Sequence, residues 1–198
     1  MKTSREEITD LLKALILISI AFAIIIRGSE LTLGQAVLIS ALTVGVGFLL
    51  HEMGHKIAAQ KYNCFAEFRA NNSMLFIMIV FAYLAGIVFA APGAVMISGH
   101  VSRRQNGIIS MWGPLVNMIL AIIFLPILLY ALTTEIVLLI QLAYYGLLIN
   151  AWLGLFNLIP FGNFDGIKIL NWNKAAYFGL VIVGLALTFS QLYFGKVV

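Results

Sequence analysis

Charged residues are scarce in this chain. Only 10% of its 198 residues are Asp, Glu, Lys or Arg, whereas 62% are hydrophobic. Soluble domains are typically about 45–50% apolar and about 25% charged, so the composition excludes an ordinary soluble domain. We expect a single integral membrane domain, residues 1–198, in a lipid bilayer. The 12 Lys and Arg are scattered between apolar segments. They therefore predict membrane topology and no nucleic-acid partner.

Cysteine and histidine are also rare. The single cysteine, Cys64, excludes an intramolecular disulfide and any zinc site built from several cysteines. The chain has three histidines, so a histidine-based metal site has few candidate ligands.

Long apolar runs joined by short polar connections predict an all-α polytopic membrane protein. About 20 residues suffice to cross a hydrocarbon core of ~30 Å at ~1.5 Å per residue. The first run is followed by Arg27 and not by a small-residue cleavage site, so we expect a retained helix and not a signal peptide. Five spans are expected, over residues 11–26, 31–50, 108–132, 136–159 and 175–194.

The uncharged segment 74–97 has two interpretations: a sixth span, or a re-entrant element that could form a β-hairpin. It is interrupted by Gly86, Pro92 and Gly93. If it re-enters and the amino terminus is cytoplasmic, the basic residues outside are Arg27 and Lys196. A full crossing would instead place outside Arg27, Arg103, Arg104, Lys168 and Lys174. The positive-inside rule therefore favours the re-entrant interpretation.

The run 31–50 leads into His51-Glu52-Met53-Gly54-His55, or HEMGH. Ionisable groups in membrane helices cost roughly 2.5–3.5 kcal/mol each on insertion scales, so their presence indicates a function. Residues four apart share one helix face, so His51 and His55 can bind one metal ion with Glu52 beside them. Two imidazoles suit zinc, but a hydrolytic zinc site normally has three protein ligands.

The third ligand must come from another part of the chain. Asp165 is the strongest candidate, because it follows a long apolar run and a break at Pro160 and Gly162. The expected topology also places it at the same side as HEMGH. His100 is the alternative ligand, although its position beside Arg103 favours a solvated interfacial residue.

Together these segments resemble the site-2 protease family of intramembrane zinc metalloproteases. The resemblance rests on HEMGH, Gly113-Pro114-x-x-Asn117, and Asn157-Leu158-Ile159-Pro160 followed by Asp165-Gly166. It covers about residues 31–170 as a catalytic core and leaves peripheral helices at about 11–27 and 175–194. The stretch 86–97 is similar to the strand that the family folds toward its active site. In one position the chain differs from the family pattern: many members have a proline two residues before the aspartate, and this chain has Asn163 there.

The resemblance implies one Zn²⁺ per chain, held by His51, His55 and Asp165, with Glu52 as the catalytic base. It implies that Asn157 lies near the substrate carbonyl. The expected function is hydrolysis of peptide bonds within or next to transmembrane segments of protein substrates. The expected location is the cell membrane, with several crossings and with the amino terminus and active-site end in the cytoplasm.

Two other functions use the same residues. A non-proteolytic membrane metal-binding or transport protein would need no glutamate beside a ligand, and an inactive homologue acting as a binding module would be expected to lack Glu52 or a ligand. Asn117 and Asn150 are candidates either for support of the transition state or for interhelical hydrogen bonds worth ~0.6 kcal/mol each.

Overall fold

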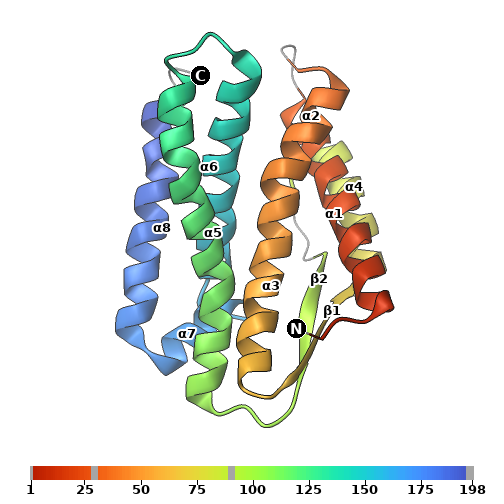
Figure 1. Ribbon diagram of the computed structural model, residues 1–198, viewed down its shortest axis with the longest axis vertical. Coiled ribbons are helices and arrows are strands. Elements are labelled where there is room, and N and C mark those ends of the chain that lie inside the picture. Colours follow the sequence, from red (N-terminus) through yellow and green to blue (C-terminus); the bar gives the residue numbers. More distant parts are fainter. Residues whose placement is uncertain (1, 28–30, 89–91, 195–198) are drawn as a thin grey trace.

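The computed structural model describes residues 2–27, 31–88 and 92–194 and is almost entirely helical (Figure 1). Helices α5, α6, α7 and α8 form one side of the molecule, and α1 to α4 with a small β-ribbon form the other. Helix α3 packs against α5 where the two sides meet. Lys196 and part of 86–97 lie outside the described residues.

Among the described residues, four helices are long and apolar enough to cross a membrane. They are α1 (Arg5–Ile26), the continuous helix Leu33–Lys61, α5 (Arg103–Ala131) and α6 (Val137–Asn157). The helix Leu33–Lys61 consists of α2 (Leu33–Ser40), one π-helical turn η1 (Ala41–Gly45) and α3 (Val46–Lys61). The fifth predicted span corresponds to α8 (Lys174–Phe194), which packs against α6 and α7. Its stretch Lys174–Ser190 is a shorter apolar helix. The all-α polytopic fold is confirmed.

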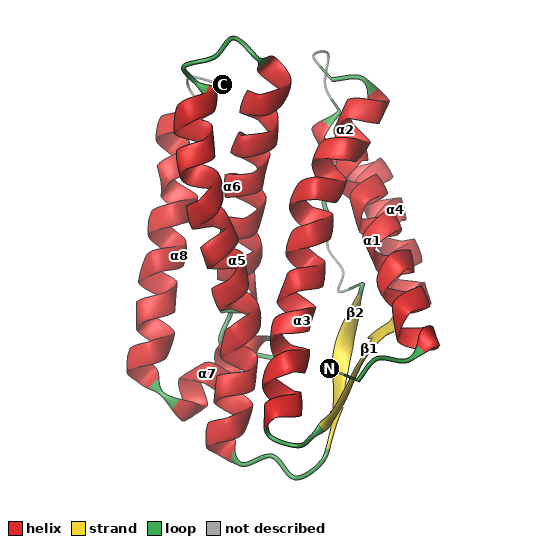
Figure 2. Ribbon diagram, viewed as in Figure 1, coloured by secondary structure: helices red, strands yellow, loops and turns green. Residues whose placement is uncertain are grey.

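The segment between α3 and α5 returns to the end of the molecule from which it leaves. Strand β1 (Phe65–Ala70) pairs antiparallel with β2 (Gly93–Ser98), and α4 (Asn72–Ala85) lies between them in the chain. The two strands stand beside α3 (Figure 2). Because Phe65 pairs with Ser98, the chain enters and leaves this segment at one place, as the re-entrant interpretation predicts.

The re-entrant segment is built differently from a hairpin within 74–97. The Asn71 side chain accepts a hydrogen bond from the Met74 N–H and starts α4, and the helix ends at Gly86 in a left-handed conformation, φ 65°. At 1.5 Å per residue its 14 residues extend roughly 21 Å, too short to cross the bilayer. The strand that pairs with β2 comes from residues before the segment.

The apolar side of the ribbon packs against the helices that surround it. Phe68 is fully buried and meets Phe48 of α3 edge to face, with ring centroids 5.8 Å apart. The same cluster includes Ile18 of α1 and Met78 of α4. This packing places the ribbon beside the HEMGH turns of α3.

Candidate metal centre

His51 and His55 lie one turn apart on α3 and converge with Asp165, the first residue of α7 (Asp165–Trp172). The Asp165 Oδ2 atom is 3.5 Å from His51 Nε2 and 3.0 Å from His55 Nε2, and the two Nε2 atoms are 3.1 Å apart. All three side chains are buried. Within the described ranges, this is the one group of three His, Cys, Asp or Glu residues close enough to bind one metal ion.

The other ring nitrogen of each histidine has a fixed partner. His51 Nδ1 is 2.6 Å from the Asn117 side-chain oxygen, and His55 Nδ1 is 2.9 Å from the Ile109 backbone oxygen. Both partners are acceptors, so each Nδ1 carries the proton and donates it. Each Nε2 then keeps a lone pair directed at Asp165. Two neutral imidazoles and a carboxylate fit zinc, with a coordination position left for water.

Asn117 is held in turn by the neighbouring helices. Its Nδ2 donates to the Gly47 carbonyl and to the Asn150 Oδ1, both at 3.1 Å. Asn150 Nδ2 donates to the Gly146 carbonyl of its own helix. The amide ladder therefore joins α3, α5 and α6 and orients His51. Asn117 and Asn150 do form the interhelical bonds considered from the sequence, and these bonds extend to a metal ligand.

Gly113 provides the space in front of the imidazoles. A Cβ atom on Gly113 would collide with Nε2 of both His51 and His55. Pro114 follows directly and interrupts the helical hydrogen bonds of α5 close to Ile109. The Gly-Pro pair thus brings α5 close to the HEMGH turns without filling the volume that a metal ion would need.

Asp165 is positioned by the break between α6 and α7. Its Oδ1 atom is 3.4 Å from Lys168 Nζ, so the two carboxylate oxygens face different partners. The nearby Lys168 ammonium favours the charged form of the Asp165 carboxyl. The carboxylate is therefore available as an anionic ligand.

Glu52 is buried beside the three ligands and contacts the β-ribbon. Its Oε2 accepts the backbone N–H of Val95 at 3.0 Å. Val95 belongs to β2, whose outer edge is not paired with another strand in the described sheet. Glu52 therefore stands between the cluster of ligands and an edge of β2 that no other described strand pairs with.

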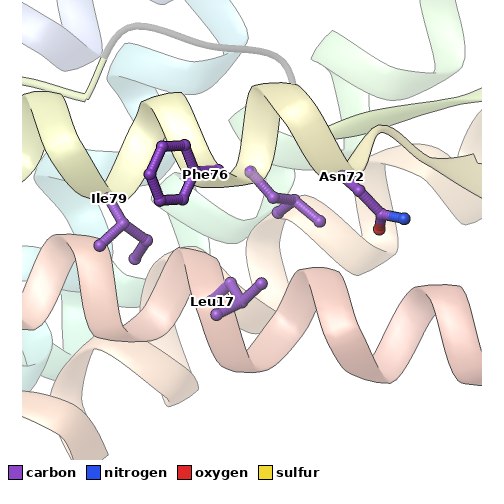
Figure 3. A pocket seen from close by; sticks show the side chains of 5 residues that line it. Leu17, Asn72, Phe76 and Ile79 are labelled. Carbon is purple, nitrogen blue, oxygen red and sulfur yellow. The ribbon is translucent and has the colours of Figure 1, made fainter.

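The remaining sequence candidates lie elsewhere. The Asn157 Nδ2 atom donates to the Leu153 carbonyl of its own helix at 2.9 Å, so its role near a substrate stays a prediction. His100 is exposed and is not in the metal cluster. An apolar pocket between α1 and α4 is lined by residues that include Leu17, Phe76 and Ile79 and none of the metal centre (Figure 3).

Sequence reasoning missed two contacts of this centre, the Ile109 carbonyl and the Val95 N–H. Both are backbone groups: every residue carries the carbonyl and every residue except proline carries the N–H, so no side-chain pattern marks them.

The comparison with known proteins agrees with this geometry. The chain is 38% identical over 157 residues to a protein of Methanocaldococcus jannaschii named "Putative zinc metalloprotease MJ0611". The match covers 79% of this chain and 80% of that protein. The chain belongs to this family of zinc metalloproteases. No model of a protein family matches this chain, and no solved structure matches it.

Proposed function

We propose that the chain is an intramembrane zinc endopeptidase of the site-2 protease type. One observation supports this most directly: the two histidines and Glu52 lie buried on a helix long and apolar enough to cross a membrane, next to the edge of β2 that no other described strand pairs with. A metal store or transporter would not need Glu52 between the ligands and that edge. The proposed substrates are transmembrane proteins or peptides cut within or beside a membrane segment.

Glu52 is the proposed proton carrier of the reaction. A zinc ion bound by His51, His55 and Asp165 would supply Lewis acidity that activates water and the scissile carbonyl. Glu52 takes a proton from the attacking water as the C–O bond to the scissile carbon forms, and then delivers that proton to the amine nitrogen as the C–N bond breaks. Burial of the Glu52 carboxylate among apolar helices excludes competing water from the proton transfer.

The outer edge of β2 is the proposed site for the substrate backbone. Phe68 and Val95 face each other in the ribbon and both direct their N–H groups away from it, so they form a non-hydrogen-bonded pair. Two residues to either side, Gly93 and Ile97 have the same orientation. An unwound substrate segment can add to β2 through the outward-facing groups of Gly93 and Ile97, on either side of the Val95 N–H that Glu52 binds, and bring a peptide bond next to Glu52.

We further propose that the active-site end faces the cytoplasm. Exposed basic residues gather where α3 ends and where α5 and α8 begin, and they include Lys61, Arg103 and Lys174. Positive charge at one end favours the cytoplasmic side of the cell membrane. With the amino terminus at the same end (Figure 1), Glu135 in the α5–α6 connection would lie outside.

The variant Glu52→Gln tests the proposal. It keeps the size of the side chain and an acceptor for the Val95 N–H but cannot accept a proton. In purified protein with a model transmembrane substrate, we expect cleavage to fall by at least about 10²-fold while zinc remains at one per chain. Cleavage at the wild-type rate would contradict the assignment of Glu52. A wild-type protein that binds zinc but cleaves no membrane substrate would favour the metal-binding alternative.

A further inference from the structure

Two buried charged residues take no part in the chemistry described above. Glu7 of α1 and Lys56 of α3 are both 0% exposed and form an ion pair. Lys56 Nζ also donates to the Thr3 hydroxyl at 3.1 Å. Lys56 directly follows the metal ligand His55, so the pair ties α1 to the turn of α3 that carries the centre.

The second oxygen of Glu7 binds the ribbon. Glu7 Oε1 accepts the Phe68 N–H at 3.0 Å. Phe68 is the register partner of Val95, whose N–H donates to Glu52 at 3.0 Å. The carboxylates of Glu7 and Glu52 therefore bind opposite outer edges of the ribbon at the same residue pair, Phe68 and Val95.

Both carboxylates are anchored to α3. Glu52 and Lys56 are four residues apart and so lie on one face of the helix. Glu52 holds the β2 edge directly, and Lys56 holds the β1 edge through Glu7. The same outer edge of β1 is also bound by Asp10, which accepts the Ala70 N–H.

Stability alone does not account for a buried ion pair at this place. Replacing such a pair with apolar residues of similar volume is often neutral or stabilising, whereas removing one partner is strongly destabilising. An ion pair that also forms a directional hydrogen bond to a strand restricts the position of that strand more tightly than apolar packing does. In this protein, the Glu7–Lys56 pair and its bond to β1 define the distance between β2 and Glu52.

We propose that Glu7 and Lys56 are positioning residues that fix the outer edge of β2 relative to Glu52 and thereby select which substrate peptide bond is cleaved. The inference rests on the proposed proteolysis and on substrate addition to β2. A ribbon held loosely would present neighbouring peptide bonds of the bound strand to the same water.

Two double variants separate the ribbon contact from the charge. Glu7→Gln with Lys56→Met removes both charges and keeps an oxygen for the Phe68 N–H. Glu7→Leu with Lys56→Met removes the charges and the acceptor. Cleavage products of a model substrate are identified by mass spectrometry, and KM and kcat are measured per zinc-loaded molecule.

We expect the Gln variant, which loses the ion pair to α3 but keeps an acceptor for the Phe68 N–H, to spread cleavage less and to raise KM less than the Leu variant. We expect the Leu variant to distribute cleavage over neighbouring bonds and to raise KM by about tenfold, equivalent to about 1.4 kcal/mol. The control is Glu6→Gln, which changes the adjacent, exposed carboxylate that pairs with Arg69 and should change neither quantity. One cleavage position and an unchanged KM in the Leu variant would overturn the proposal.

Glu7→Asp provides the second variant in case the Leu variant does not fold. It keeps both charges but shortens the side chain by one methylene, so it cannot reach Lys56 and Phe68 together. Cleavage should again spread to neighbouring bonds, and an unaltered cleavage position would overturn the proposal. Failure of the proteolytic function is recognised separately, because the wild-type protein would then cleave nothing or Glu52→Gln would remain active.

Discussion

The Asn117 side-chain oxygen lies 2.6 Å from His51 Nδ1, which makes the amide a partner of a metal ligand. Partners of this kind fix the ring orientation and the tautomer, and losing one costs about 10–100-fold in metal affinity. Asn117→Ala should therefore weaken zinc binding by about that factor, as measured by competition with a chelator. Asn150→Ala removes only the next bond of the ladder and should weaken binding less. An equal loss in both variants would contradict the direct role of Asn117.

Removal of the metal should abolish proteolysis reversibly. Dialysis against a chelator is expected to eliminate cleavage, and one equivalent of Zn²⁺ should restore it, because the ligands are side chains of the folded protein. Asp165→Asn should lower the bound zinc to well below one per chain by removing the anionic ligand. His100→Ala is the matched control and should retain zinc. Full zinc affinity in Asp165→Asn would place the third ligand elsewhere.

Gly113→Ala should prevent metal binding without unfolding the protein. The added methyl group would occupy the space before the His51 and His55 Nε2 atoms. We expect zinc content to fall at least tenfold while the helical circular dichroism stays unchanged. Gly179→Ala, where a Cβ atom meets no other atom within 4 Å, is the control. Full zinc content in Gly113→Ala would show that the ion binds at another place.

Cysteine labelling tests the re-entrant topology and the orientation. Cys64 is first replaced with serine, and single cysteines are introduced by Asn63→Cys, His100→Cys and Glu135→Cys at exposed positions. Because β1 pairs with β2, a membrane-impermeant reagent should label positions 63 and 100 from the cytoplasmic side and position 135 from the opposite side. Labelling of positions 63 and 100 from opposite sides would refute the re-entrant topology.

The sequence predicts the metal centre as far as local spacing allows. The four-residue separation of His51 and His55 determines a shared helix face wherever the helix lies, and the structure places Asp165 against both rings. Side chains that act through tertiary contacts are less predictable. Lys56 contributes one basic residue to the topology count, but its buried contact with Glu7 depends on how α1 packs.

The re-entrant segment shows the same limit. Its return could be inferred from charge, but its construction could not, because β1 lies outside the apolar run and pairs with β2 across 22 intervening residues, 71–92. Helical α4 follows from its Asn71 cap and its uninterrupted apolar stretch, features that a strand assignment would ignore. The strand edge beside Glu52 is thus a product of tertiary pairing and not of local preference.

The π-helical turn η1 sets the rotation between the two halves of the long helix Leu33–Lys61. Such a turn amounts to one extra residue inside an α-helix, and one residue corresponds to a rotation of about 100°. In this helix, η1 packs against α1 and α3 packs against α5. Without the extra residue, either α2 would turn away from α1 or the HEMGH turns of α3 would turn away from α5. The one π-helical turn therefore aligns the HEMGH turns with α5 while the first part of the helix stays against α1.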